Sequence, residues 1–133
     1  MAVQDSSKDL DGVLVVTVEQ AVAAPYTSCR LADAGARVIK VERPEGDFAR
    51  NYDSNALGNS AYFVWLNRGK ESVSLDLKNK NDFLLFKNII SKADILIQNL
   101  APGAFERLGI DLKELRKEYP RLITCSISGF GDD

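Results

Sequence analysis

Three positively charged side chains of this sequence stand where they could hold an anionic ligand. Arg43 and Lys78 each follow a segment with the pattern of a β-strand, and Arg107 comes shortly after another such segment. The carboxyl ends of parallel strands meet at one edge of a sheet, and open α/β sheets bind their ligands there. Guanidinium and ammonium groups complement phosphate oxygens, so the three cations are typical of a site for a phosphate-rich ligand. Solvated surface charge is the alternative interpretation.

Other kinds of chemistry are excluded by the composition. The 133 residues include no His, which excludes a Ser-His-Asp triad, a His-ligated zinc site and a His general base within this chain. The two cysteines, Cys29 and Cys125, have neither metal-binding nor redox spacing. We therefore interpret both as reduced core residues of a cytoplasmic protein and expect no metal site.

Charge and hydropathy argue against two classes of partner. The formal net charge is −2, whereas a nucleic-acid-binding domain normally carries a basic excess. No apolar run reaches the roughly 18 residues that a membrane-spanning helix needs. We therefore expect neither a nucleic acid nor a membrane as partner. The segment after the first predicted strand, EQAVAAP, also lacks the G-x-G-x-x-G pattern of dinucleotide-binding proteins.

The segments that must position the candidate residues alternate between strand and helix patterns. The first apolar run, VLVVTV, has no polar alternation and suits a strand that is buried on both faces of a parallel sheet. The alternation predicts the α/β class, with an open, mostly parallel Rossmann-like sheet and helices on both faces. We predict strands at residues 13–18, 37–42, 72–77, 94–98 and 121–127.

Capping and stop signals predict the helices between these strands. Pro25 is expected at the first position of a helix that Gly35 ends, and Asn79 or Asn81 is expected to cap the next one. Shorter helices are expected at residues 104–108 and, capped by Asp111, up to Glu118.

Three stretches have a less definite pattern. Residues 61–67 fit a short helix or a strand, and residues 43–60 have the composition of an irregular loop, which at this length is usually functional or disordered. We expect residues 1–9 to form a disordered tail and residues 10–133 to form one domain.

Four blocks of the sequence occur in a specific order and spacing. They are LDGVLVVTVEQAVAAPYTSCRLADAGARVIKVERPEGDFAR, LNRGKESVSLDLK, ADILIQNLAPGAFERLG and PRLITCSISGFG. Together these blocks resemble the N-terminal part of the family III CoA-transferases, a family that includes formyl-CoA and carnitine CoA-transferases and the 2-methylacyl-CoA racemases. The resemblance implies an N-terminal, truncated CoA-binding Rossmann-like domain of a cytoplasmic homodimeric enzyme.

The resemblance also implies a CoA-binding edge made of ten residues. Ala21, Val22 and Ala23 would form a backbone-lined wall near the thioester, although packing of a tight turn is an alternative reading of them. Arg43 and Arg107 would contact phosphates. The other positions that match the family pattern are Leu75, Lys78, Asn99, Leu100 and Ala101.

Four polar residues near this edge receive no role in binding or catalysis. We interpret Asp47 and Arg50, from the stretch GDFAR, as an ion pair that orders a loop. Glu19 and Gln20 follow the first strand, where the wall of the active site is expected, and neither is assigned a catalytic role.

The chemistry implied by the resemblance needs residues that these 133 do not supply. In the transferases an Asp carboxylate attacks the acyl-CoA thioester, forms an aspartyl–acyl anhydride, and a carboxylic acid acceptor then takes the CoA. The family pattern puts that Asp about forty residues past the GFG turn, so Asp132 and Asp133 do not match it, and we expect the chain alone to be inactive. Two alternatives stay open: a fragment of an acyl-CoA racemase, and a stand-alone CoA- or nucleotide-binding module without catalysis.

Overall fold

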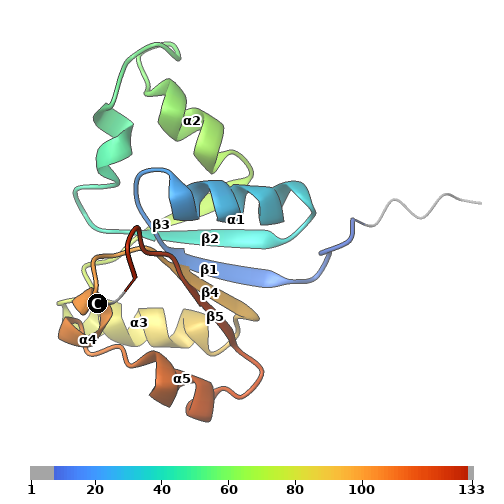
Figure 1. Ribbon diagram of the computed structural model, residues 1–133, viewed down its shortest axis with the longest axis vertical. Helices are drawn as coiled ribbons and strands as arrows, with labels where there is room; N and C mark the ends of the chain where they lie inside the picture. Colours follow the sequence, from blue (N-terminus) through green and yellow to red (C-terminus); the bar gives the residue numbers. More distant parts are fainter. Residues whose placement is uncertain (1–7, 132–133) are drawn as a thin grey trace, which may run out of the picture.

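Five parallel strands form the centre of the protein, which is described here for residues 8–131 by a computed structural model (Figure 1). The order across the sheet is β3-β2-β1-β4-β5, so the chain starts in the middle and builds outward in both directions. All four strand pairs are parallel. The strands are β1 Leu14–Val18, β2 Arg37–Glu42, β3 Lys70–Ser74, β4 Ile95–Gln98 and β5 Ile123–Ser126. The predicted α/β class with a parallel sheet is confirmed.

Helices cover both faces of this sheet (Figure 1). One face carries α1 and α2, and the other carries α3, α4 and α5. A 3₁₀ helix, η1, lies in the segment between β2 and α2. The bounds are α1 Ala23–Asp33, η1 Phe48–Asn51, α2 Ala61–Asn67, α3 Lys80–Ile90, α4 Ala104–Arg107 and α5 Leu112–Glu118.

Alternation along β1 divides the core into two layers. Val16 and Val18 pack with Phe86 of α3 in the layer under α3–α5, whereas Val15 packs with Ala24 of α1 in the other layer. Successive side chains of a strand point to opposite faces, and β1 is buried on both because it has a strand on each side and helices above and below. This is what its continuous apolar run predicts.

Several element boundaries differ from the sequence predictions. Helix α1 begins at Ala23, so Pro25 occupies its third position rather than its first; this costs nothing, because none of the first N–H groups of a helix has a partner within it. The third strand is Lys70–Ser74 rather than 72–77. Its ladder with β2 ends at Ser74, and the buried Leu75 and the half-buried Leu77 continue into the core after the strand has ended.

Other predictions are resolved by the packing. Residues 61–67 form helix α2, capped by the Ser60 hydroxyl, and Asn79 rather than Asn81 caps α3. Cys29 is buried as predicted, but Cys125 lies on the outer strand β5 and is only half-buried. Within the predicted tail, Lys8 donates a hydrogen bond to the Asp33 carbonyl oxygen, and residues 1–7 lie outside the described residues.

Two features are absent from the described residues. Between residues 8 and 131, no helix combines the length and the apolar character needed to cross a membrane. The same residues contain no group of three or more His, Cys, Asp or Glu side chains placed to hold a metal ion.

Candidate functional site

A pocket of about 430 Å³ opens at the carboxyl ends of β1, β2 and β3. We call it the rim pocket. The last residues of β1 and β2 and the residues that follow β1, β2 and β3 line it. They are residues 18–20, 41–47 and 75–78, and Leu100 and Leu108 close the pocket from the side of β4 and α4. Ligands of open α/β sheets bind at this edge because the strands end there and the loops diverge.

The predicted cations lie along this edge in two adjoining pockets. Arg43 and Lys78 line the rim pocket. Arg107 lines a second pocket of about 380 Å³, which shares Lys78, Leu77 and Leu108 with the first. Lys78 is thus the cation that the two pockets share, with Arg43 lining one and Arg107 lining the other.

The floor of the rim pocket is apolar. Leu75 is buried, and Val18 and Val41 close the floor from the neighbouring strand ends. Five acidic residues also line the pocket, and three of them, Glu19, Glu42 and Asp47, are paired with Lys70, Arg50 and Lys40. Arg43 and Lys78 beside this apolar floor suit a ligand that carries phosphates at one end and an uncharged, partly apolar body at the other.

The three small residues predicted to form a wall lie beside the rim pocket rather than in its lining. Ala21 follows Gln20, which does line the pocket, and Ala21 has a φ of +62°. Val22 and Ala23 are exposed at the start of α1, and no side chain caps that helix. The turn thus presents backbone and small side chains next to the pocket.

The side chain of Asn99 is engaged in holding two strand ends together. Its Nδ2 donates to the Gln20 carbonyl oxygen at 2.8 Å, and its Oδ1 accepts from the Gln20 N–H at 2.9 Å. Asn99 follows β4 and Gln20 follows β1, so this pair of bonds joins their carboxyl ends. Of the two residues after Asn99, Leu100 lines the rim pocket, and Ala101 lines a separate pocket beside α4 and α5.

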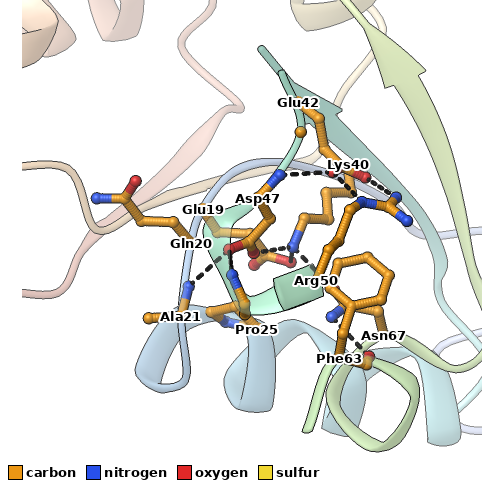
Figure 2. A network of polar contacts seen from close by, with 12 residues as sticks. Glu19, Gln20, Ala21, Pro25, Lys40, Glu42, Asp47, Arg50, Phe63 and Asn67 are labelled. Atoms are coloured by element: carbon orange, nitrogen blue, oxygen red, sulfur yellow. Dashed lines mark hydrogen bonds and ion pairs between the residues drawn. The ribbon is translucent and has the colours of Figure 1, made fainter. Parts of the chain in front are cut away.

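A network of buried charges supports the site from the side of α1 and α2 (Figure 2). Lys40 of β2 is 1% exposed, and its Nζ donates to Asp47 Oδ2 at 2.7 Å and to Asn67 Oδ1 at 2.9 Å. Lys70 of β3 pairs with the buried Glu19 at 2.7 Å, and the Ser28 hydroxyl donates to the same carboxylate. Burial lowers the pKa of Lys70, against the opposing effect of Glu19.

Glu42 holds the loop after β2 in this network. Burial alone would raise the pKa of its carboxyl, but hydrogen bonds from the Arg50 guanidinium, the Asp47 N–H and the Ser72 hydroxyl outweigh burial and lower the pKa to about 2. The bonds from Arg50 measure 2.7 and 2.9 Å. Glu42 is therefore a carboxylate throughout the neutral range.

The predicted ion pair between Asp47 and Arg50 is wrong. Both residues do order the loop, but Asp47 pairs with Lys40 and Arg50 pairs with Glu42. The reason is that β2 ends with two charged side chains on one face of the sheet, two residues apart, and each takes the loop residue of opposite charge. The sequence RVIKVE held a signal for this pairing. Alternate residues of a strand share a face, so Lys40 and Glu42 lie on the same face as Val38, where each needs a partner of opposite charge.

The comparisons with known proteins agree on one family. A family model described as CoA-transferase family III matches residues 10–133. Acetyl-CoA:oxalate CoA-transferase from Acetobacter aceti is 44% identical over 122 residues, which are 91% of this chain and 31% of that protein. Succinyl-CoA:mesaconate CoA-transferase from Haloarcula hispanica is 40% identical over 130 residues, covering 92% of this chain and 32% of that protein.

A solved structure gives the same result. The crystal structure of a CAIB/BAIF family protein from Brucella suis superimposes with a TM-score of 0.87 at 37% identity, covering 96% of this chain and 35% of that one. The chain thus spans about a third of the length of the curated relatives it matches.

Proposed function

Because the chain belongs to CoA-transferase family III, we propose that it binds the CoA part of an acyl-CoA along the edge formed by the carboxyl ends of its strands. The observation that carries this proposal is the position of Arg43, Lys78 and Arg107 over two adjoining pockets with an apolar floor. CoA fits both features, because it carries phosphates on its nucleotide and has a long uncharged pantetheine arm.

Each candidate residue has a place in this proposal. Arg43 and Arg107 contact phosphate oxygens, and Leu75 and Lys78 flank the nucleotide. Leu100 and Ala101, with the Asn99 backbone, contact the ligand from the side of β4. The turn of Ala21, Val22 and Ala23 faces the pantetheine arm near the thioester, where small side chains let the ligand approach the main chain.

The reaction proposed for the longer protein moves CoA between carboxylic acids. An Asp carboxylate attacks the thioester carbonyl, the C–S bond breaks, CoA leaves as the thiolate, and an aspartyl–acyl anhydride remains. The CoA thiolate then attacks the Asp carbonyl of this anhydride, which releases the donor carboxylate and leaves an aspartyl-CoA thioester. The acceptor carboxylate displaces CoA from that thioester and forms a second anhydride, and the thiolate attacks the acceptor carbonyl, which gives the new acyl-CoA and the free Asp carboxylate. To these 133 residues, which cover 31% of the acetyl-CoA:oxalate CoA-transferase, we assign the CoA site and no catalytic residue.

Isothermal titration calorimetry with CoA tests the assignment. Arg43→Ala and Arg107→Ala should each weaken binding by about 1–3 kcal/mol, roughly 5- to 150-fold, because each removes a charge-assisted hydrogen bond to a phosphate. Arg121→Ala is the matched control, since the exposed Arg121 precedes β5 and so lies at the opposite edge of the sheet. If both test variants bind CoA as tightly as the control, the edge is not the CoA site.

A further inference from the structure

The turn after β1 is held in an unfavourable conformation from two sides. Ala21 has a φ of +62°, a left-handed conformation that residues with a Cβ atom rarely adopt. Asn99 holds both backbone groups of Gln20, and Asp47 Oδ1 accepts a hydrogen bond from the Ala21 N–H at 3.2 Å. Hydrogen bonds from residues far away in the sequence thus stabilise the unfavourable backbone conformation of Ala21.

Asp47 is itself fixed in place. Its side chain is fully buried, and Lys40 Nζ lies 2.7 Å from Oδ2. Oδ1 also accepts from the Ala49 N–H at 2.9 Å, and the Asp47 N–H donates to Glu42 Oε2 at 3.0 Å. Lys40 belongs to the interior strand β2, so Asp47 connects the sheet to the turn (Figure 2).

Asp47 also belongs to the segment that lines the rim pocket. Residues 41–47 carry Arg43 on that lining, and Ala21 follows Gln20, which also lines the pocket. A single carboxylate therefore joins the segment that holds a phosphate-binding arginine to the turn proposed to face the thioester.

We propose that Asp47 is a positioning residue that holds the Gln20–Val22 turn in its left-handed form for the acyl-CoA, an inference that rests on the proposed function. When only one conformation of a site accepts its ligand, the observed affinity falls in proportion to the population of that conformation. Without the Asp47 carboxylate the Ala21 turn populates the left-handed form less, so CoA binding weakens through the turn and needs no contact between Asp47 and the ligand.

The test must separate this role from the contribution of Asp47 to the fold. Removing Asp47 alone would leave Lys40 buried without its carboxylate, so the principal variant is Lys40→Met with Asp47→Leu. Replacing a buried ion pair by apolar side chains of similar volume often leaves stability unchanged. Asp47→Asn serves as the second variant: its amide oxygen still accepts from the Ala21 N–H, more weakly, and it retains the shape of the site.

The first readout is amide hydrogen exchange in the free chain. In the double variant the Ala21 amide should exchange about tenfold faster or more, while the amides of β1 and β4 keep their wild-type rates, because only a local opening has become easier. Asp47→Asn should change the Ala21 rate in the same direction by a smaller factor. An Ala21 rate unchanged relative to the β1 amides would overturn the proposal.

The second readout is CoA affinity with rescue by glycine. The double variant should bind CoA about tenfold more weakly than wild type. Adding Ala21→Gly to the double variant should recover CoA affinity, because glycine adopts the left-handed form without strain. This gain should be larger than the change that Ala21→Gly causes in the wild-type chain. Asp53→Ala is the control: its carboxylate accepts from the Asn55 and Ala61 N–H groups in the same loop, without contacting the turn.

The outcomes separate the two proposals. If Asp53→Ala weakens CoA binding as much as the double variant, or if glycine recovers nothing, Asp47 acts only on the loop and the positioning role is wrong. If the wild-type chain fails to bind CoA, the proposed function fails, and the exchange rate of Ala21 still decides whether Asp47 holds the turn.

Discussion

Glu42 keeps its negative charge at the end of β2 because three neighbours donate to it. Arg50, Ser72 and the Asp47 N–H lower the pKa of the Glu42 carboxyl from its ordinary value of 4.5 to about 2, against the effect of burial. A carboxyl whose pKa is lowered by folding stabilises the protein above the pKa of the unfolded chain. That stabilisation is lost as the pH falls through the folded value.

Glu42→Gln should therefore lower the free energy of unfolding by roughly 2–3 kcal/mol at pH 7. The difference from wild type should shrink as the pH falls from about 4.5 towards 2, because the wild-type carboxyl then becomes protonated as well. Urea denaturation at pH 7, 4 and 2.5 measures this. The exposed Glu106→Gln is the control, and an undiminished difference between Glu42→Gln and wild type at pH 2.5 would contradict the prediction.

Beyond the ends of strands β1 and β4, a side chain that follows β4 is hydrogen-bonded to the backbone that follows β1. Asn99 after β4 donates to and accepts from the backbone of Gln20 after β1, and the two residues are 79 positions apart. Backbone ladders pair these strands up to Val18 and Gln98. The amide of Asn99 continues the pairing one step further, where the chain turns away towards α1.

Asn99→Ala should lower the free energy of unfolding by about 1–2 kcal/mol, because it leaves two half-buried backbone groups without their partners. Denaturant unfolding followed by circular dichroism gives this value. Asn88→Ala is the control, since Asn88 is exposed on α3 and surface substitutions usually change stability by about 0.5 kcal/mol or less. Equal unfolding midpoints for the two variants would show that the Asn99 bonds contribute nothing.

Among the described residues, five exposed aromatic side chains gather on the side of the sheet that carries α1 and α2. A chain of rings runs across η1, α2 and α1, with neighbouring centroids 5.8 to 6.2 Å apart. This aromatic cluster consists of Phe48, Tyr52, Tyr62, Trp65 and Tyr26, each 39–50% exposed. Contiguous exposed apolar patches usually mark a surface that associates.

We predict that the 133-residue chain self-associates, most simply as a two-fold dimer. Size-exclusion chromatography with light scattering at about 100 μM should give the mass of a dimer, since such surfaces associate in the micromolar range. Trp65→Ser should shift the chain towards monomer. Leu84→Ser is the matched control, because Leu84 is 55% exposed on α3, over the other face of the sheet. A monodisperse wild-type monomer would contradict the prediction.

Local patterns in the sequence were enough for the elements and for part of the site. The apolar run of β1 and the caps Asn79 and Asp111 depend on residues next to one another in the chain. Arg43 and Lys78 could be placed at one edge because the carboxyl ends of parallel strands always meet there. These inferences require only the identities of residues close together in the chain and one general rule of sheet geometry.

Only the tertiary structure decided which polar and charged groups meet. Lys40 with Asp47, Asp47 with the Ala21 N–H, and Asn99 with Gln20 join residues 7, 26 and 79 positions apart. Glu42 likewise takes Arg50, although the sequence suggested Asp47 as the partner of that arginine. The reason is physical: a buried charge must find a partner among the groups that packing brings within hydrogen-bond distance, and that set exists only once the strands have taken their order and the loop after β2 has folded back on the sheet.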